Sequence, residues 1–284
     1  MTLVYCSIPE QFVNPLFEVF DGGDFVLSSY RSVEASLTDV QLYFPEAERT
    51  EEAKRLLSDA LSIVGVEAEL VVREVPDEDW KFAYRRHFTT ERIGRHVIVH
   101  PDWEPQPETK PGDVVVSIDP GLAFGTGKHE TTKACLEFID EVCGEAGGGS
   151  FLDMGCGSGI LSIAAKKLGF GEVRGFDVDQ EAVEASQENA AKNGVEIEFF
   201  RYGLGSKVKR DLGRADLVAA NILGPLLIKF ADEIVPAVEK RLVISGILTE
   251  LYPEVLHAFE QRGIEELGRK TIGEWTSGLL GVRE

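Results

Sequence analysis

The chain has 284 residues, of which 43% are hydrophobic and 27% charged, a mixture typical of a globular protein with one large domain or two smaller ones. Its formal net charge of −20 disfavours broad, sequence-independent binding to nucleic acid, which depends on phosphate neutralisation by Lys and Arg. No apolar run approaches the roughly 20 residues that cross a bilayer, and the N-terminus lacks a secretion-signal pattern, so we expect a cytoplasmic protein. A basic macromolecular partner fits the charge, as does an acidic surface that keeps the protein soluble.

Residues 1–75 contain six short elements in the order strand, helix, strand, strand, helix, strand. The strands lie around 3–8, 24–30, 35–44 and 66–75, and the helices around 10–20 and 46–64. The second helix repeats its apolar residues at three- and four-residue spacing. This order predicts a small ferredoxin-like α+β domain. It carries no catalytic chemistry, so we expect it to recognise a substrate.

Residues 76–90 predict a linker helix, with Pro76 and Asp77 at its start. The arginines of this region suit a solvated helix face, with contact to RNA as the alternative; they are Arg85, Arg86, Arg92 and Arg95. A proline-rich loop and a strand at 113–118 lead into a further glycine-rich stretch.

The stretch GLAFGTGKHETT, 121–132, resembles a phosphate-binding loop but departs from it at two fixed positions. Gly121 is one residue too far from Gly127-Lys128, and His129 stands where the loop needs Ser or Thr. A zinc motif on His129 fails too, because Lys133 occupies the place of the second histidine. The four cysteines form no CxxC pair, so we expect no metal site.

From Phe151 onward, strands and helices alternate, which predicts a mostly parallel sheet with helices on both faces. The predicted strands are 151–155, 173–178, 197–202, 215–222 and 241–247, followed by two strand-like runs at the end of the chain. The predicted helices are 159–169, 180–194, 224–239 and 250–262. Ligands of such sheets bind beyond the carboxyl ends of the strands.

The first strand ends at Asp153, followed by glycines at 155, 157 and 159. Glycines let the backbone turn tightly and approach a ligand closely. A dinucleotide fingerprint needs a glycine at 160, where this chain has Ile160. The loop therefore suits a cofactor that has no phosphate to anchor, with Asp153, Gly155 and Gly157 as candidate cofactor-binding residues.

Two further strand ends carry polar residues. Asp177 ends the second strand, where an acid can accept hydrogen bonds from both ribose hydroxyls of an adenosine, and Asp179 suits a helix cap. Adenosine without phosphates indicates S-adenosylmethionine.

Asn221 ends the fourth strand and offers one acceptor and two donors to the cleft, with a simple strand-end cap as the alternative. Enzymes that methylate amide or base nitrogens often carry Asn-Pro-Pro-aromatic here, so Ile222-Leu223 disfavours a DNA, RNA or glutamine target.

The combination of PGLAFGTGKHETT, LDMGCGSGILSIAA, GFDVD, VAANI and GEWTS resembles the PrmA family of ribosomal protein methyltransferases. Enzymes of that family trimethylate protein number eleven of the large ribosomal subunit, which lies at the base of the ribosomal stalk. The resemblance covers nearly the whole chain. It implies a substrate-recognition domain at 1–75, a linker helix at 76–90 and a catalytic domain at 91–284 with a Rossmann-like, seven-stranded methyltransferase fold. The expected reaction is transfer of methyl groups from S-adenosylmethionine to amino groups, on lysine side chains and the N-terminal amine.

The resemblance also assigns roles to residues. It implies that Thr132, Gly155, Asp177 and Asn221 contact the cofactor or face the cleft, and that 121–132 forms a lid over the methyl donor. Asn221 is the candidate catalytic residue that orients the amine. Alternatives are a lysine methyltransferase of another protein, a small-molecule methyltransferase and a cofactor-binding protein without catalysis. We expect a monomer with no direct contact to nucleic acid or membrane.

Overall fold

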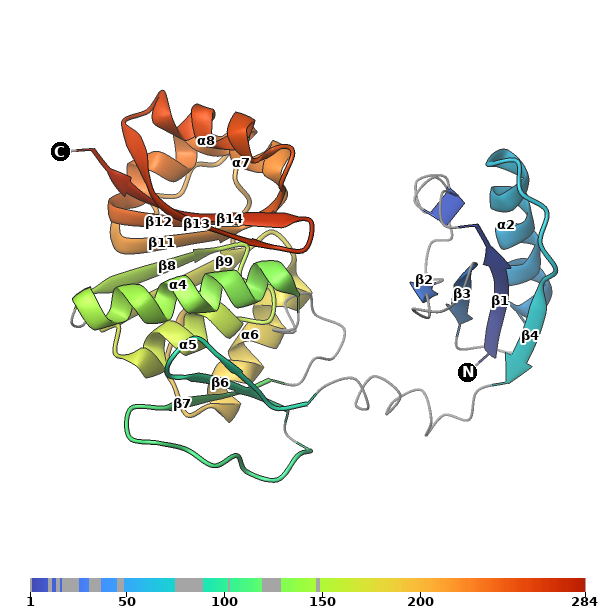
Figure 1. Cartoon of the computed structure of the whole chain (residues 1–284), viewed down its shortest axis with the longest axis horizontal. Coiled ribbons are helices and arrows are strands. Elements are labelled where there is room, and N and C mark those ends of the chain that lie inside the picture. The colour runs from blue at the N-terminus through green and yellow to red at the C-terminus, as the bar shows by residue number, and fades with distance from the viewer. Residues whose placement is uncertain are drawn as a thin grey trace. The chain divides into compact units, whose positions relative to one another are not determined.

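The computed structural model describes residues 2–9, 12–13, 16, 26–30, 37–44, 49–74, 89–101, 103–118, 129–146 and 149–283. The chain divides into two compact units, 1–87 and 88–284 (Figure 1). Of the predicted linker helix at 76–90, only Thr89 and Thr90 belong to the described residues, and they are not helical. None of the helices that the structure describes is long and apolar enough to span a membrane.

The smaller unit contains a four-stranded antiparallel sheet with the strand order β2-β3-β1-β4. Its elements are β1 (Thr2–Ile8), β2 (Val26–Tyr30), β3 (Thr38–Phe44), α2 (Thr50–Ile63) and β4 (Val71–Glu74). Leu57 of α2 shares a buried core with Val4 of β1 and Val40 of β3. With β1 and β3 in the centre, the sheet has the predicted ferredoxin-like arrangement. β4 is shorter than the predicted strand at 66–75, because it pairs with β1 only over Thr2–Tyr5.

The larger unit begins with a three-stranded sheet in the order β5-β6-β7. Its strands are β5 (Glu91–Ile93), β6 (Val97–His100) and β7 (Val114–Ser117). The prediction of a solvated helix face was wrong for Arg92, which lies in β5 and donates to both carboxylate oxygens of Asp113 at 2.7 and 2.6 Å. Arg85 and Arg86 lie outside the described residues. Only β7 was predicted; of the two missed strands, β5 has three residues, too few to show a period.

The main sheet of the larger unit has seven strands in the order β10-β9-β8-β11-β12-β14-β13. The first five run parallel and β14 is antiparallel to both of its neighbours. Its strands are β8 (Ser150–Met154), β9 (Glu172–Asp177), β10 (Glu198–Arg201), β11 (Ala215–Asn221), β12 (Val238–Leu248), β13 (Ile264–Ile272) and β14 (Trp275–Val282). The predicted mostly parallel, seven-stranded sheet is confirmed.

Helices cover both faces of this sheet (Figure 1). They are α4 (Glu130–Ala146), α5 (Ile160–Leu168), α6 (Gln180–Lys192), α7 (Gly224–Ile234) and α8 (Tyr252–Glu260). The first three lie on one face and the last two on the other. α7 is shorter than the predicted 224–239, because Pro236 lacks the N–H that an α-helix needs. A 3₁₀ turn at Val235–Ala237 leads directly into β12.

The alternation of side chains along the strands places three polar residues on one face. On β11, Leu217 and Ala219 join the core beneath α4 and α5, whereas Val218 and Ala220 join the core beneath α7 and α8. Since successive side chains point to opposite faces, Asn221 belongs to the face of Ala219. The same period places Asp153 of β8 and Ser245 of β12 on that face, and Asn221 pairs in register with Ser245.

Candidate functional site

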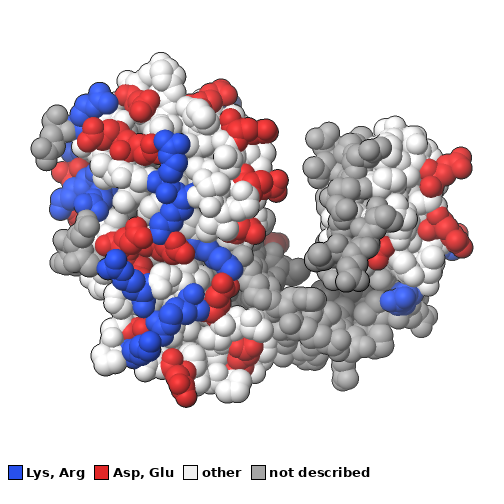
Figure 2. Space-filling model, viewed as in Figure 1, with Lys and Arg blue, Asp and Glu red and all other residues white. Residues whose placement is uncertain are grey.

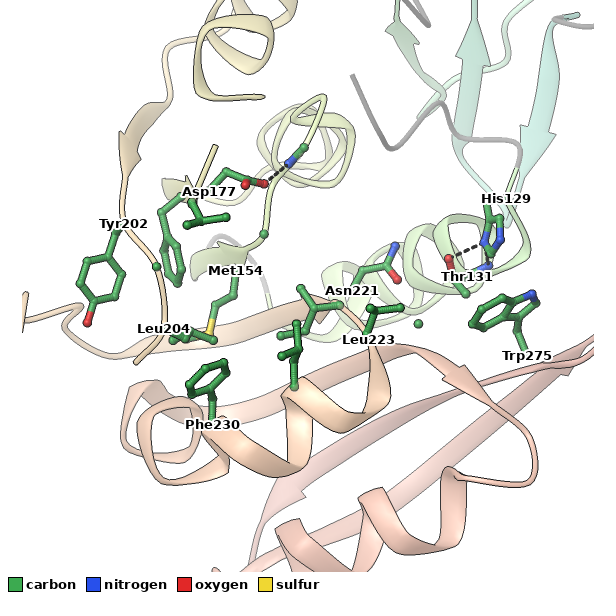
Figure 3. A pocket seen from close by; sticks show the side chains of 18 residues that line it. His129, Thr131, Met154, Asp177, Tyr202, Leu204, Asn221, Leu223, Phe230 and Trp275 are labelled. Atoms are coloured by element: carbon green, nitrogen blue, oxygen red, sulfur yellow. Dashed lines mark hydrogen bonds between the residues drawn. The ribbon is translucent and has the colours of Figure 1, made fainter. Parts of the chain in front are cut away.

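A cavity of about 620 Å³ opens at the carboxyl ends of β8, β9 and β11. This is the edge where open α/β sheets bind ligands. In Figure 3, Asp177 and Tyr202 lie toward one end of the cavity, Asn221 lies further along, and His129 and Trp275 lie at the other end. Gly155 and Gly157 also line it, so four of the six predicted site residues face one cavity.

The glycine loop after β8 shapes the floor of this cavity. Gly155, Gly157 and Gly159 all have positive φ, at 77°, 52° and 78°, a region that side chains disfavour. The N–H groups of Gly155 and Cys156 both donate to the carbonyl oxygen of Phe176, at 2.9 and 3.0 Å. A Cβ at Gly155 would lie 2.7 Å from Cγ2 of Ile222. Glycine is therefore required where the loop passes the end of β11, and it leaves the cavity open.

Asp177 ends β9 with its carboxylate at the cavity. One oxygen accepts the N–H of Gly157 at 3.0 Å and the other accepts the N–H of Asp179 at 3.1 Å. These bonds fix the carboxylate and leave it lone pairs for a diol in the cavity. Asp179 is the N-cap of α6, where its side chain accepts the N–H of Glu181 at 3.0 Å, as predicted.

Apolar side chains form the wall beside Asp177. The rings of Phe176 and Tyr202 meet edge to face, with centroids 5.4 Å apart. Met154, Leu204 and Phe230 continue this wall (Figure 3). A flat, apolar ring system fits between such groups, with its attached sugar at Asp177.

Asp153 is fully buried and does not line the cavity. One of its oxygens accepts the hydroxyl of Ser162 at 2.7 Å and the N–H of Ser162 at 3.2 Å. The other oxygen has no hydrogen-bond partner in the described part of the chain. Burial raises the pKa of Asp153 to about 7, the bonds from Ser162 oppose that rise, and the charge of Asp177 adds to it.

Asp153→Asn is expected to stabilise the fold at pH 8 and to have little effect near pH 4. The carboxyl is protonated in both folded and unfolded chains below its ordinary pKa of 3.8, and ionised in both above about 7. Between these values the folded state retains a proton that the unfolded chain has lost, so folding stability falls as pH rises. A shift of this size corresponds to about 4 kcal/mol. Urea unfolding of both proteins at the two pH values measures the difference; an equal difference at both would contradict the account.

Thr132 is buried in the first turn of α4 and does not line the cavity, whereas its neighbour Thr131 does. The carbonyl oxygen of Thr131 accepts the hydroxyl of Ser245 at 3.2 Å, and Ser245 also bonds Ser277 at 2.6 Å. This hydroxyl chain ties the start of α4 to β12 and β14. The lid predicted at 121–132 is described only from His129 onward.

The side chain of Asn221 faces the cavity and forms no hydrogen bond within the described residues. Behind it, β12 comes very close to the end of β11 at Gly246, whose φ is 80°. A Cβ at Gly246 would lie 2.4 Å from the carbonyl oxygen of Ile222. The backbone that carries Asn221 is therefore held closely, and the side-chain amide can bond a ligand in the cavity.

A family model described as "Ribosomal protein L11 methyltransferase (PrmA)" matches residues 21–281. The chain belongs to this family. A ribosomal protein L11 methyltransferase of Caldanaerobacter subterraneus is 36% identical over 263 residues, which cover 92% of this chain and 81% of that relative. Another, of Geobacter sulfurreducens, is 44% identical over 205 residues, covering 71% of this chain and 66% of the relative.

A solved structure agrees with this membership. The crystal structure of the ribosomal protein L11 methylase of Lactobacillus delbrueckii matches with a TM-score of 0.63 at 28% identity. It covers 69% of this chain and 100% of that chain. As a member of the PrmA family, the protein is a methyltransferase with S-adenosylmethionine as its cofactor. The relatives do not favour the alternatives of a lysine methyltransferase of another protein or a small-molecule methyltransferase, and they support an enzyme over a cofactor-binding protein without catalysis.

The cavity fits that cofactor. Gly155 adds no side chain to the cavity, where a Cβ would crowd Ile222. The fixed carboxylate of Asp177 suits a ribose, and the apolar wall at Phe176 suits an adenine. The residues that the sequence analysis missed are His129, Thr131, Tyr202 and Trp275. For Trp275 a signal existed, since GEWTS was part of the resemblance, but nothing in the sequence places it beside Asn221.

Proposed function

We propose that this enzyme methylates amino groups of ribosomal protein L11, on lysine side chains and at the N-terminal amine. The observation that supports it best is the free amide of Asn221 in the same cavity as the carboxylate of Asp177. The names of the relatives specify L11 as the substrate of those proteins. Ile222-Leu223 after Asn221 supports an amine target over an amide or a base.

The proposed site residues have distinct roles. Asp177 would accept hydrogen bonds from the ribose hydroxyls of the cofactor, and Gly155 and Gly157, which line the same cavity, would let the cofactor approach the backbone. Asp153 and Thr132 are buried beneath the cavity, so we assign them to the placement of the glycine loop and of the first turn of α4. When bound, S-adenosylmethionine supplies an electrophilic methyl group on a positively charged sulfur.

Asn221 is the proposed catalytic residue. A protonated amine has no lone pair, so the amine must lose a proton before it attacks, and each transfer releases one proton. An apolar surrounding such as Ile222, Leu223 and Leu226 favours the neutral amine. While the neutral amine still carries an N–H, the carbonyl oxygen of Asn221 would accept it and so orient the lone pair of the nitrogen for attack. Alignment is then the main requirement, and no nucleophilic side chain is needed.

We further propose that 1–75 recognises the substrate, 76–90 links it and 91–284 is catalytic. The division into compact units 1–87 and 88–284 supports these roles. A ribosomal protein substrate favours a cytoplasmic enzyme, and we propose that it is a monomer without its own nucleic-acid site. On the face shown in Figure 2, Lys and Arg side chains are interspersed with Asp and Glu, which suits a protein partner better than a phosphate backbone.

The test uses L11 of the same organism in two forms, native and with all its amines acetylated. Each is incubated with the enzyme and S-adenosylmethionine, and added methyl groups are located by tandem mass spectrometry. We expect methyl groups on lysine and N-terminal amines of native L11 and none on acetylated L11. Methylation of the acetylated protein, or of carbon or amide atoms, would overturn the proposal.

A further inference from the structure

Two aromatic rings lie at the end of the cavity opposite Asp177. His129 and Trp275 have ring centroids 5.1 Å apart and meet edge to face (Figure 3). Both line the cavity that Asn221 faces. The segment Ile222-Leu223 after Asn221 supplies no ring, so the described aromatic groups at this end come from β14 and from the start of α4.

Trp275 is held by a rigid hairpin. It pairs with Ile272 across a two-residue turn, in which Gly273 has a φ of 59°, and with Leu248 on the other side. The N–H and hydroxyl of Thr249 both donate to the carbonyl oxygen of Glu274, at 2.8 and 3.0 Å. The backbone that carries Trp275 therefore has a fixed position before a ligand arrives, which lowers the entropy lost on binding.

His129 is positioned by its neighbour Thr131. Its Nδ1 lies 2.7 Å from the hydroxyl of Thr131 and accepts the N–H of Thr131 at 3.4 Å. The remaining ring nitrogen, Nε2, lies 4.0 Å from a carboxylate oxygen of Glu130, and both side chains are partly exposed. A cation that approaches the two rings thus also approaches a carboxylate.

We propose that Trp275 and His129 form an aromatic subsite, in the cavity that Asn221 faces, that binds the substrate side chain as an alkyl-ammonium ion before it loses its proton and again after each methyl transfer. This inference rests on the proposed methylation of amines. Tryptophan is the best ring for attracting an ammonium group within about 6 Å of its face. The flat rings also cover the methylene chain that carries the nitrogen.

An aromatic subsite suits repeated methylation of one nitrogen. An ammonium group has three N–H donors, and each added methyl group removes one of them. A site built on hydrogen bonds would therefore lose contacts with every transfer, whereas the attraction between a ring and a cation needs no N–H. The subsite can hold the substrate at each stage while its methyl count rises.

The first arm of the test compares Trp275→Leu, which keeps an apolar side chain, with Trp275→Phe, which keeps a ring. Val208→Ala, at an exposed residue outside the cavity, is the control. We expect Trp275→Leu to raise the KM for L11 roughly 3-fold to 30-fold and to accumulate products with fewer methyl groups. Trp275→Phe should lie close to wild type, and all variants should keep their affinity for S-adenosylmethionine. Equal KM and equal products for the Leu and Phe variants would overturn the proposal.

The second arm does not depend on L11. With S-adenosylhomocysteine bound, the wild-type enzyme is titrated with butyltrimethylammonium and with its neutral carbon isostere, by calorimetry. We expect the cation to bind more tightly than the isostere, and Trp275→Leu to abolish the difference. Equal binding of the two probes to wild type would overturn the subsite. Failure of wild type to methylate L11, with selective binding of the cation retained, would instead overturn the proposed substrate.

Discussion

Asp177→Ala is expected to weaken binding of S-adenosylmethionine at least about 100-fold. The carboxylate is fixed by the N–H groups of Gly157 and Asp179 and faces the cavity. Hydrogen bonds from ribose hydroxyls to a charged oxygen contribute roughly 1.5–3 kcal/mol each, so the loss of two exceeds the 2.7 kcal/mol of a 100-fold change. Isothermal titration calorimetry of the two proteins measures this effect.

The matched control is Asp179→Ala, two residues further along the chain. Asp179 caps α6 and does not line the cavity. Its loss should lower the free energy of unfolding by about 1 kcal/mol and leave cofactor affinity within about threefold of wild type. If the two variants bound the cofactor equally well, Asp177 would not be the ribose ligand.

Gly246→Ala is expected to destabilise the catalytic unit and to lower methyl transfer at least about 10-fold. A Cβ there would lie 2.4 Å from a backbone atom, the carbonyl oxygen of Ile222, which cannot rotate away as a side chain can. Relief requires the end of β11 to move, and Asn221 would move with it. A displacement of about 1 Å at a reacting group can lower a rate about 100-fold.

Gly263→Ala separates this contact from the effect of backbone conformation. Gly263 has a φ of 79°, nearly that of Gly246, but its Cβ would meet nothing within 4 Å. It should show only the intrinsic strain of the left-handed region, about 1–2 kcal/mol, with activity unchanged. Urea unfolding and turnover of both variants test the distinction. Equal loss of stability in the two would show that the close approach at Gly246 is unimportant.

The order of elements was predictable because apolar periods are local properties of the sequence. The alternation of strands and helices after Phe151 predicted the parallel sheet. The glycines after Asp153 and the acid at Asp177 predicted the edge of the sheet that binds the ligand. The strand β5 was missed because three residues cannot establish a period. The strand β6 was missed although it is as long as β7, which was predicted. The predicted helix at 224–239 extended beyond the end of α7, because the apolar residues before Pro236 continue the helical pattern.

The composition of the site depends on contacts that sequence patterns do not contain. Thr131 and Thr132 are adjacent, and only the packing of α4 against the sheet decides which of them faces the cavity. His129 and Trp275 are 146 positions apart in the sequence, and β14 brings them together by returning between β12 and β13. Asn221 could be placed at the site from sequence because it ends β11, and the neighbouring strand β8 leads into the glycine loop of the same site.

The most direct test of the account is a time course of intact L11 mass with the enzyme and S-adenosylmethionine, using wild type and Asn221→Ala. We expect wild type to add single methyl groups one after another. We expect the variant to lose most of this rate and to retain its affinity for the cofactor, measured in parallel. Unmodified L11 with wild type, or equal rates for the two proteins, would contradict the assignment of L11 methylation to this cavity and to Asn221.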